Sequence, residues 1–225
     1  SSKTSGVFDP SSGCLFNEYS RAKASNERMN KNTIQSCLNH QGMDKIEFDT
    51  LGYPFKLDSF VELNFNAIAK GYLVDLIGNY LNQENRENYM VEVGGEVVAN
   101  GVNLFGEPWR VGINTPLIGA DPLNFFEVIE LNNQALATSG NYQNFYKIDN
   151  KLIGHTIDPR SGQPMINELR SASILHKNCA VADAYATACM TLGLEESKKI
   201  ISNDSSISAY LIYENDSTLE GVFVR

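Results

Sequence analysis

Two oxygen-bearing side chains, Asp183 and Thr187, stand four residues apart in an alanine-rich segment. Residues at this spacing share one face of an α-helix, so a carboxylate and a hydroxyl would point the same way. Mg²⁺ prefers such oxygen ligands, and a substrate phosphate often completes its shell. The pair therefore predicts a small Mg²⁺ site near the start of a helix, where backbone N–H groups also favour anions. A solvated aspartate and a threonine bonded to its own turn would show the same spacing.

A second group of reactive residue types surrounds His155, which ends an apolar stretch and precedes a turn-rich segment. The dipeptides Asp-Pro at 158–159 and Ser-Gly at 161–162 favour a tight turn there. An imidazole at this strand end would be placed to act as a general acid or base, and the Arg160 guanidinium could face an anion. A histidine that only satisfies local hydrogen bonds is the other interpretation.

Gly94 and Gly95 follow an apolar strand-like run at a point where backbone without side chains could approach a ligand closely. A β-bulge or a tight turn explains the pair equally well. The sequence has no GxGxxG and no GxxxxGK[ST] motif, which excludes the Rossmann and P-loop ways of binding phosphate. Ser139 lies outside any GxSxG elbow and is interpreted as a structural turn residue.

The overall charge restricts the classes of partner. The 225 residues include 27 Asp and Glu against 18 Lys and Arg, for a formal net charge of −9. A surface of that sign repels phosphate backbones and anionic lipid headgroups, so no nucleic-acid partner is expected. No run of residues approaches the ~20 apolar residues of a spanning helix, so no membrane span is expected either. A polyanionic substrate would need a local source of positive charge.

The cysteines carry little information by themselves. The four of them form no CxxC pair of the kind that zinc sites use: Cys14, Cys37, Cys179 and Cys189. Their spacing predicts buried or idle thiols. The even count also permits disulfides, so the redox compartment stays open.

The candidate groups need helices to position them. Apolar residues recur every four positions along 67–81, which predicts a helix with one continuous apolar face packed on a sheet. That face would consist of Ile68, Tyr72, Leu73, Leu76, Ile77, Tyr80 and Leu81. Further helices are predicted over 181–192 and 195–201. A short surface helix is expected between Arg21 and Asn39, closed by Gln41 and Gly42.

Strand-like alternation fills much of the remaining sequence. Hairpins are predicted within 45–57, 125–138, 144–157 and 208–224, and further strands at 89–93 and 109–113. Strands follow one another without regular βαβ alternation. The chain is therefore expected to be a single α+β domain, residues 1–225, with a largely antiparallel sheet and packed helices.

Seven short segments carry a joint signal: Gly6–Pro10, Asn66–Tyr72, Val93–Gly95, Trp109–Ile113, Thr138–Tyr142, His155–Gly162 and Ala182–Thr187. In this order the chain resembles the ApbE family of FAD:protein FMN transferases. Each segment is modest by itself, but their order along nearly the whole chain is highly specific. The resemblance implies an α+β fold of the T-fold type, in agreement with the strand-rich pattern.

The resemblance also implies an activity and a site. The enzyme would bind FAD, split its pyrophosphate with Mg²⁺, attach the FMN half through a phosphoester to a Thr or Ser hydroxyl of an acceptor protein, and release AMP. The implied metal ligands are the backbone carbonyl of Ala67 and the positions of Asp183, Thr187 and, in some members, Ala186. The implied flavin contacts are Val7, Phe8, Asp9, Asn64, Lys70, Gly94, Gly95 and Ile157.

These residue types suit the implied chemistry. Asp183 would be the main anionic anchor of the metal, which would supply the positive charge that a pyrophosphate needs. Lys70, three residues after Ala67, could hold the flavin or a phosphate oxygen. The acceptor hydroxyl needs a base, for which His155 is the first candidate. Asp183 is the second, because a metal-bound carboxylate is a poor base.

Two features depart from the family pattern. Asn64 occupies a position where the family commonly has Asp, so a charged contact to FAD becomes a neutral one. The family's early Met-Gly-Thr segment, which helps to close the flavin site, is absent from this sequence, so the domain is expected to lack its N-terminal segment.

Two other functions remain open at this point. The same site could give its phosphoryl group to water, as an FAD pyrophosphatase that releases FMN and AMP, or it could bind FAD without catalysis. The resemblance further implies a location in the bacterial cell envelope or periplasm, with a lipid anchor upstream of Ser1.

Overall fold

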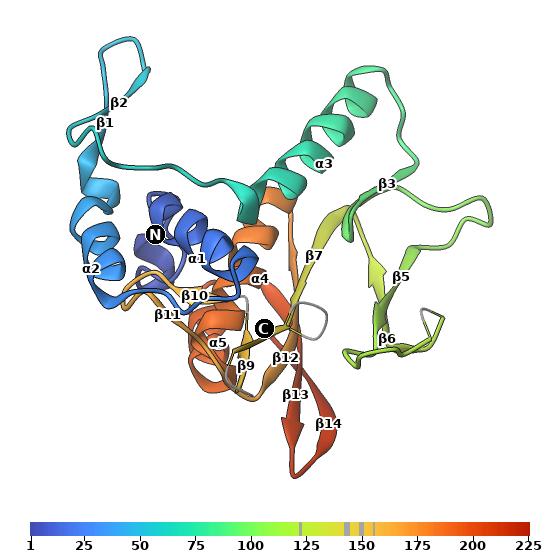
Figure 1. The fold of residues 1–225 in the computed structure, drawn as a ribbon. Coiled ribbons are helices and arrows are strands. Elements are labelled where there is room, and N and C mark those ends of the chain that lie inside the picture. The colour runs from blue at the N-terminus through green and yellow to red at the C-terminus, as the bar shows by residue number, and fades with distance from the viewer. Residues whose placement is uncertain (122, 142–144, 149–150, 155) are drawn as a thin grey trace. The chain divides into compact units, whose positions relative to one another are not determined.

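The computed structural model describes residues 1–121, 123–141, 145–148, 151–154 and 156–225, with the backbone alone for 145–148 and 151–154 (Figure 1). The chain divides into two compact units. Unit 1 consists of Ser1–Phe65 and Asn144–Ile166, and unit 2 consists of Asn66–Gln143 and Asn167–Arg225. The prediction of a single domain stays a prediction.

Unit 2 is built on a six-stranded sheet with the order β14-β13-β12-β7-β4-β3. Every neighbouring pair in it is antiparallel, which confirms the predicted α+β class with a largely antiparallel sheet. Its strands are β3 (Tyr89–Val93), β4 (Glu96–Asn100), β7 (Gln134–Gly140), β12 (Leu169–His176), β13 (Ser208–Asn215) and β14 (Thr218–Val224).

Two of these strands, β4 and β12, were not predicted from the sequence. In β12 the hydroxyls of Ser171 and Ser173 alternate with apolar residues, yet both serines are buried. The side chain of Ser173 hydrogen-bonds to that of Thr138 on β7, at 2.8 Å. A buried hydroxyl that finds its partner only across the sheet gives no local strand signal.

Three helices accompany this sheet: α3 (Asn66–Gln83), α4 (Cys179–Leu192) and α5 (Leu194–Ser202). They confirm the predicted helices to within a few residues at each end. Helix α4, orange in Figure 1, packs on β7 and β12. Its buried face combines small residues, Ala182, Ala186 and Cys189, with the larger Met190. Because small side chains let a helix lie close to a sheet, α4 carries Asp183 deep into the unit.

The predicted apolar face of α3 is wrong. Tyr72, Leu73, Leu76 and Tyr80 are all exposed. The buried stripe is instead Gly71, Val74 and Gly78, at the i, i+3, i+7 spacing of one helix face. This stripe belongs to the side of α3 that contacts α4, β3 and β4. Two glycines on it favour close packing over burial of large side chains.

Unit 2 also contains a two-stranded antiparallel ribbon, β5 (Trp109–Asn114) and β6 (Phe125–Leu131). Trp109, Val111 and Ile129 of this ribbon pack on a small apolar cluster that includes Leu131 and Leu136. None of the helices among the described residues is long and apolar enough to cross a membrane.

Unit 1 contains two helices and short strands. Its elements are η1 (Ser2–Thr4), α1 (Gly13–Ala24), α2 (Lys31–His40), η2 (Met43–Lys45), β1 (Ile46–Phe48), β2 (Pro54–Lys56), β8 (Phe145–Ile148), β9 (Lys151–Gly154), β10 (Ile157–Asp158) and β11 (Gln163–Pro164). Helix α2 and the β1–β2 hairpin confirm the predictions for those segments, whereas α1 was not predicted.

A disulfide joins α1 to α2, between Cys14 and Cys37, whose Cα atoms lie 5.4 Å apart. The interpretation of all four cysteines as buried or idle thiols was therefore wrong for these two. It holds for Cys179 and Cys189, which are free and buried. The pairing was not predictable from spacing, because it depends on how α1 and α2 pack around Leu15 and Ile34.

Candidate functional site

Asp183 is a buried carboxylate, only 4% exposed, on the α4 face that meets α3. Its Oδ2 accepts a hydrogen bond from the backbone N–H of Gly71, at 3.1 Å. A Cβ at Gly71 would stand 2.5 Å from the Cys179 carbonyl oxygen. Glycine at this position therefore allows the close helix contact that brings the Asp183 carboxylate to the backbone of α3.

Burial makes the Asp183 carboxylate costly to ionise. The loss of hydration raises its pKa to about 6, the Gly71 N–H opposes this rise, the Glu96 charge adds to it, and the Lys70 charge lowers it. No lysine, arginine or histidine among the described residues forms an ion pair with Asp183. A bound cation would supply the missing charge compensation.

The other predicted metal ligands lie on the same two helices. Thr187 follows Asp183 by one turn of α4, and its Oγ1 lies 3.4 Å from the Ser139 hydroxyl on β7. Ala186 is fully buried, and because its methyl side chain has no ligating atom, it could contribute only through its backbone. Ala67 lies in the first turn of α3. In a regular α-helix the carbonyl at this position pairs with the N–H four residues later, which is that of Gly71. The Gly71 N–H here donates to the Asp183 carboxylate.

This donor set suits a hard cation but is small. It would offer one carboxylate, one hydroxyl and one carbonyl, and Mg²⁺ commonly takes a few protein oxygens of this kind and keeps its waters. No group of three or more His, Cys, Asp and Glu side chains able to hold a metal occurs within the described part of the chain. Of the three predicted ligand groups, the Asp183 carboxylate is the single anionic one.

Lys70 lies beside the turn between β3 and β4. Its ammonium is 2.5 Å from the Glu96 carboxylate and 3.3 Å from the Gly94 carbonyl oxygen. Gly94 and Gly95 have φ of 61° and 96°, so they form the tight turn that was one of the two interpretations of the pair. A Cβ at Gly94 would come within 3.3 Å of Cδ of Lys70. The turn thus lets the lysine stem lie across it.

In unit 1, the predicted flavin contacts Val7, Phe8 and Asp9 form one ordered turn before α1. Val7 is buried, and the N–H of Phe8 donates to the Thr4 hydroxyl at 3.3 Å. The Asp9 carboxylate accepts from the N–H and the hydroxyl of Ser11, at 2.9 and 2.6 Å. This carboxylate therefore fixes the backbone of the turn.

Two neighbouring segments of unit 1 complete this group. The N–H of Asn64 donates to the Pro10 carbonyl at 2.7 Å, which places Asn64 beside the Val7–Asp9 turn. Ile157 is buried in the short β10–β11 hairpin. Arg160 in that hairpin lies 3.7 Å from where a Cβ would sit on Gly6. The unit thus brings together the segments that hold Val7, Asn64 and Ile157.

Arg160 does not present a free guanidinium to an anion. It donates to both oxygens of the buried Asp158 carboxylate, from Nε at 3.0 and 3.2 Å and from Nη2 at 2.8 Å. Hydrogen bonding to Asp158 raises the pKa of Arg160 further. The predicted tight turn is confirmed, since the N–H of Gly162 donates to the Asp158 carbonyl at 2.7 Å. His155, the predicted base, lies outside the described residues.

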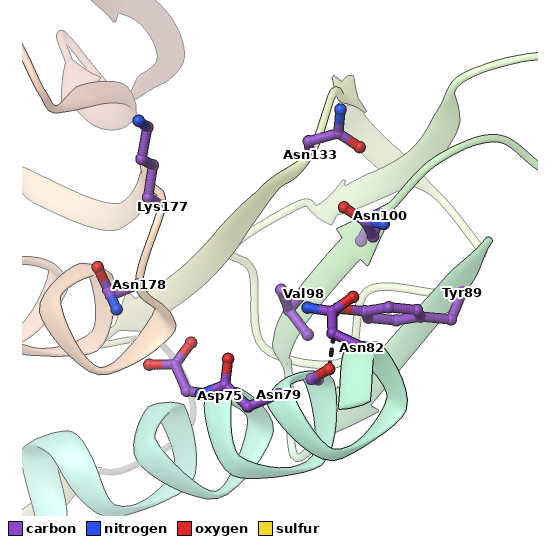
Figure 2. A pocket seen from close by; sticks show the side chains of 11 residues that line it. Asp75, Asn79, Asn82, Tyr89, Val98, Asn100, Asn133, Lys177 and Asn178 are labelled. Carbon is purple, nitrogen blue, oxygen red and sulfur yellow. Dashed lines mark hydrogen bonds between the residues drawn. The ribbon is translucent and has the colours of Figure 1, made fainter. Parts of the chain in front are cut away.

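The N-terminus of α4 is already capped, contrary to the view that it favours an anion next to Asp183. Asp75 of α3 accepts from the N–H groups of Cys179 and Ala180, at 2.8 and 2.9 Å. Asp75 lines a polar hollow of about 150 Å³, and five of the eleven residues that line this hollow are asparagines (Figure 2). None of the predicted site residues lines this hollow.

Sequence reasoning missed the role of Glu96 beside Lys70 and that of Asp75 as a helix cap. Both are acidic residues that look solvated in the sequence, and each acts on a residue far away in the chain. The one local signal for Glu96 was its position directly after Gly94 and Gly95. That position gains meaning only from the structure, in which Glu96 is buried at the start of β4.

The chain is similar to known proteins in its sequence and in its fold. The sequence pattern of the ApbE family matches residues 1–211. A protein of Vibrio cholerae named FAD:protein FMN transferase is 38% identical over 154 residues, which cover 68% of this chain and 45% of that protein. This chain thus spans about half the length of the curated relatives that it matches.

Solved structures show the same fold. The flavin transferase ApbE from Vibrio cholerae superposes with a TM-score of 0.81 at 28% identity, covering 99% of this chain and 70% of that one. The apo form of the flavinyl transferase ApbE from Pseudomonas stutzeri gives a TM-score of 0.84 at 28% identity, covering 100% and 69%. Because the family pattern matches residues 1–211, nearly the whole chain, the chain belongs to the ApbE family.

Proposed function

We propose that this protein is an FAD:protein FMN transferase. It binds FAD, splits the pyrophosphate with the help of Mg²⁺, transfers FMN to a Thr or Ser hydroxyl of an acceptor protein and releases AMP. The observation that carries the proposal is the buried Asp183 carboxylate of an ApbE family member. It is bonded to the Gly71 N–H and has no basic partner among the described residues. The names of the related proteins support the same activity.

Asp183, Thr187 and the Ala67 carbonyl would hold the cation, with Ala186 as a further backbone contributor. When bound, Mg²⁺ would offset the charge of the pyrophosphate and of the phosphoryl group in transfer. Asp183 needs no large movement for this role, because its Gly71 hydrogen bond occupies Oδ2 and leaves Oδ1 for a ligand. The net charge of −9 does not oppose an anionic substrate if the cation is local.

Lys70 would bind an anionic oxygen of FAD. Its ammonium donates to Glu96 and to the Gly94 carbonyl, and its side chain is 47% exposed. Gly94 and Gly95 leave their turn bare of side chains, so that a planar ring or a ribityl chain could lie against the backbone. Val7, Phe8, Asp9, Asn64 and Ile157 would make the further flavin contacts in unit 1.

The acceptor hydroxyl would lose its proton to His155. A weak nucleophile of this kind needs a base near the operating pH, and an imidazole meets that requirement. Asp183 is the second candidate, although a carboxylate that holds a cation is a poorer base.

The two other functions share the FAD site and differ in the acceptor. A pyrophosphatase would give free FMN and AMP, and a binding protein would leave FAD intact. To separate them, the protein is incubated with FAD, Mg²⁺ and a peptide that carries a Thr. Flavin fluorescence that stays on the denatured peptide supports transfer. Free FMN alone, or unchanged FAD alone, contradicts it in favour of the corresponding alternative.

We also propose a location in the bacterial cell envelope. The Cys14–Cys37 disulfide supports this, because disulfides persist in oxidising compartments and are rare in the cytosol. Alkylation of intact cells before lysis tests the proposal. Cys14 and Cys37 should resist the reagent until a reductant is added, and immediate alkylation of both would contradict it. A lipid anchor stays a prediction.

A further inference from the structure

Glu96 is a buried carboxylate that no motif assigns to the site. It opens β4 directly after the Gly94-Gly95 turn and is 1% exposed. Its Oε2 lies 2.5 Å from the Lys70 ammonium. Burial raises the pKa of Glu96, and the Lys70 hydrogen bond opposes that rise. Among the described residues, Lys70 is the one basic side chain that pairs with this buried carboxylate.

A buried ion pair of this kind is expected to contribute little to the stability of the folded protein. Removing two charges from water costs several kcal/mol per ion, and apolar residues of similar volume are often as stable or more so. In this pair only the carboxylate is fully buried, while the lysine side chain is 47% exposed. The arrangement therefore resembles a support for the lysine more than a buried structural ion pair.

The support has a clear geometric effect on Lys70. One N–H of the ammonium donates to Glu96 and another to the Gly94 carbonyl. The third has no acceptor within the described part of the chain, and the half-exposed side chain can offer it to a ligand. The Lys70 charge also reaches Asp183, where it lowers the pKa of that carboxylate.

We propose that Glu96 is a positioning residue that fixes the Lys70 ammonium over the Gly94 carbonyl, where it can bind an anionic oxygen of FAD. By the same contact Glu96 keeps Lys70 away from Asp183, whose carboxylate stays open for a cation. The identity of the ligand rests on the proposed function, whereas the effect on Lys70 does not.

The effect on Lys70 is tested first, without any ligand. An amine-acetylating reagent is applied to wild type and to Glu96→Gln, and the rate of Lys70 modification is followed by mass spectrometry. Loss of a charge-assisted hydrogen bond should raise that rate by about tenfold. The Lys199–Glu196 pair has the same 2.5 Å distance but is exposed. Glu196→Gln should change the Lys199 rate less than twofold.

The effect on FAD is tested by a double-mutant cycle, with affinity measured from quenching of flavin fluorescence. Glu96→Gln should weaken FAD binding by about tenfold, which corresponds to ~1.4 kcal/mol. In a Lys70→Met background the same change should have no further effect. Glu84→Gln, which removes an exposed carboxylate directly after α3, should change the affinity less than twofold.

The outcomes separate this inference from the proposed function. An unchanged Lys70 modification rate in folded Glu96→Gln would overturn the inference. Equal losses of affinity with and without Lys70 would also overturn it, because Glu96 would then act by another route. If wild type fails to bind FAD, the proposed function fails, while the modification rates still decide whether Glu96 fixes Lys70. Thermal unfolding of each variant checks that it is folded.

Discussion

Replacing Asp183 by Asn should stabilise the protein at alkaline pH when no divalent cation is present. Burial raises the pKa of Asp183 from its ordinary 3.8 to about 6. A carboxyl with a raised folded-state pKa favours the folded state when protonated, so its contribution is fully present below pH 3.8 and is lost as the pH rises through about 6. At pH 8 the native wild type therefore carries an uncompensated buried charge.

The magnitude follows from the same values. The difference between 3.8 and about 6, at 1.36 kcal/mol for each pH unit, is ~3 kcal/mol. Asparagine keeps an oxygen for the Gly71 N–H and removes the charge. We expect Asp183→Asn to be more stable than wild type by about 2–3 kcal/mol at pH 8 and by less than about 1 kcal/mol at pH 4.

The assay is urea unfolding in the presence of a chelator, followed by the fluorescence of the single tryptophan, Trp109. Comparing the two proteins at both pH values cancels the other titrating groups. Asp216→Asn, which removes the same charge from an exposed turn, is the control and should show no such pH dependence. The reasoning is refuted if Asp183→Asn is less stable than wild type at pH 8, or if the difference is the same at both pH values.

Three further predictions concern other parts of the account. Gly71→Ala places a Cβ 2.5 Å from the Cys179 carbonyl oxygen. It should lower the free energy of unfolding by about 3 kcal/mol, measured as a lower urea midpoint. An unchanged midpoint would contradict the close α3–α4 contact. The Cys14–Cys37 disulfide joins residues 23 positions apart, and its reduction should lower the free energy of unfolding by about 3 kcal/mol. A Cys14→Ser/Cys37→Ser variant whose stability still falls when reductant is added would contradict this. Thr187→Val should lower Mg²⁺-dependent transfer, measured as the flavin attached to the peptide, by about 10–100-fold. The affinity for FAD in the absence of Mg²⁺ should not change. Full transfer activity in this variant would remove Thr187 from the set of metal ligands.

Local sequence patterns were sufficient for much of the fold. The apolar repeats predicted α3 and α4 almost to their ends, and the turn residues predicted the hairpins at β1–β2 and β13–β14. These features depend on neighbours within a few residues. The packing of one helix on another and the pairing of one strand with another depend on residues far apart in the sequence. For this reason β12 and the buried face of α3 were not predicted. The packing of α3 is decided by Gly71 and Gly78, which carry no apolar signal. The predicted hairpin within 125–138 was wrong, because β6 pairs with β5, and β7 pairs with β4 and β12.

Site residues that belong to a sequence motif could be predicted. Residues whose role depends on a tertiary contact could not. Asp183 and Lys70 stand on their predicted helices. Three hydrogen bonds of the site join residues more than 20 positions apart. They link Asp183 to Gly71, Asp75 to Cys179, and Glu96 to Lys70. No pattern within one segment reports such pairs.

The central claim is tested most directly by measuring AMP and peptide-bound flavin in the same reaction. The protein is mixed with FAD, Mg²⁺ and a threonine peptide, AMP is quantified by chromatography, and the peptide is weighed by mass spectrometry. We predict one AMP for each peptide that gains an FMN phosphoester, with both products lost in Asp183→Asn. AMP accompanied only by free FMN, or no AMP at all, would contradict the account.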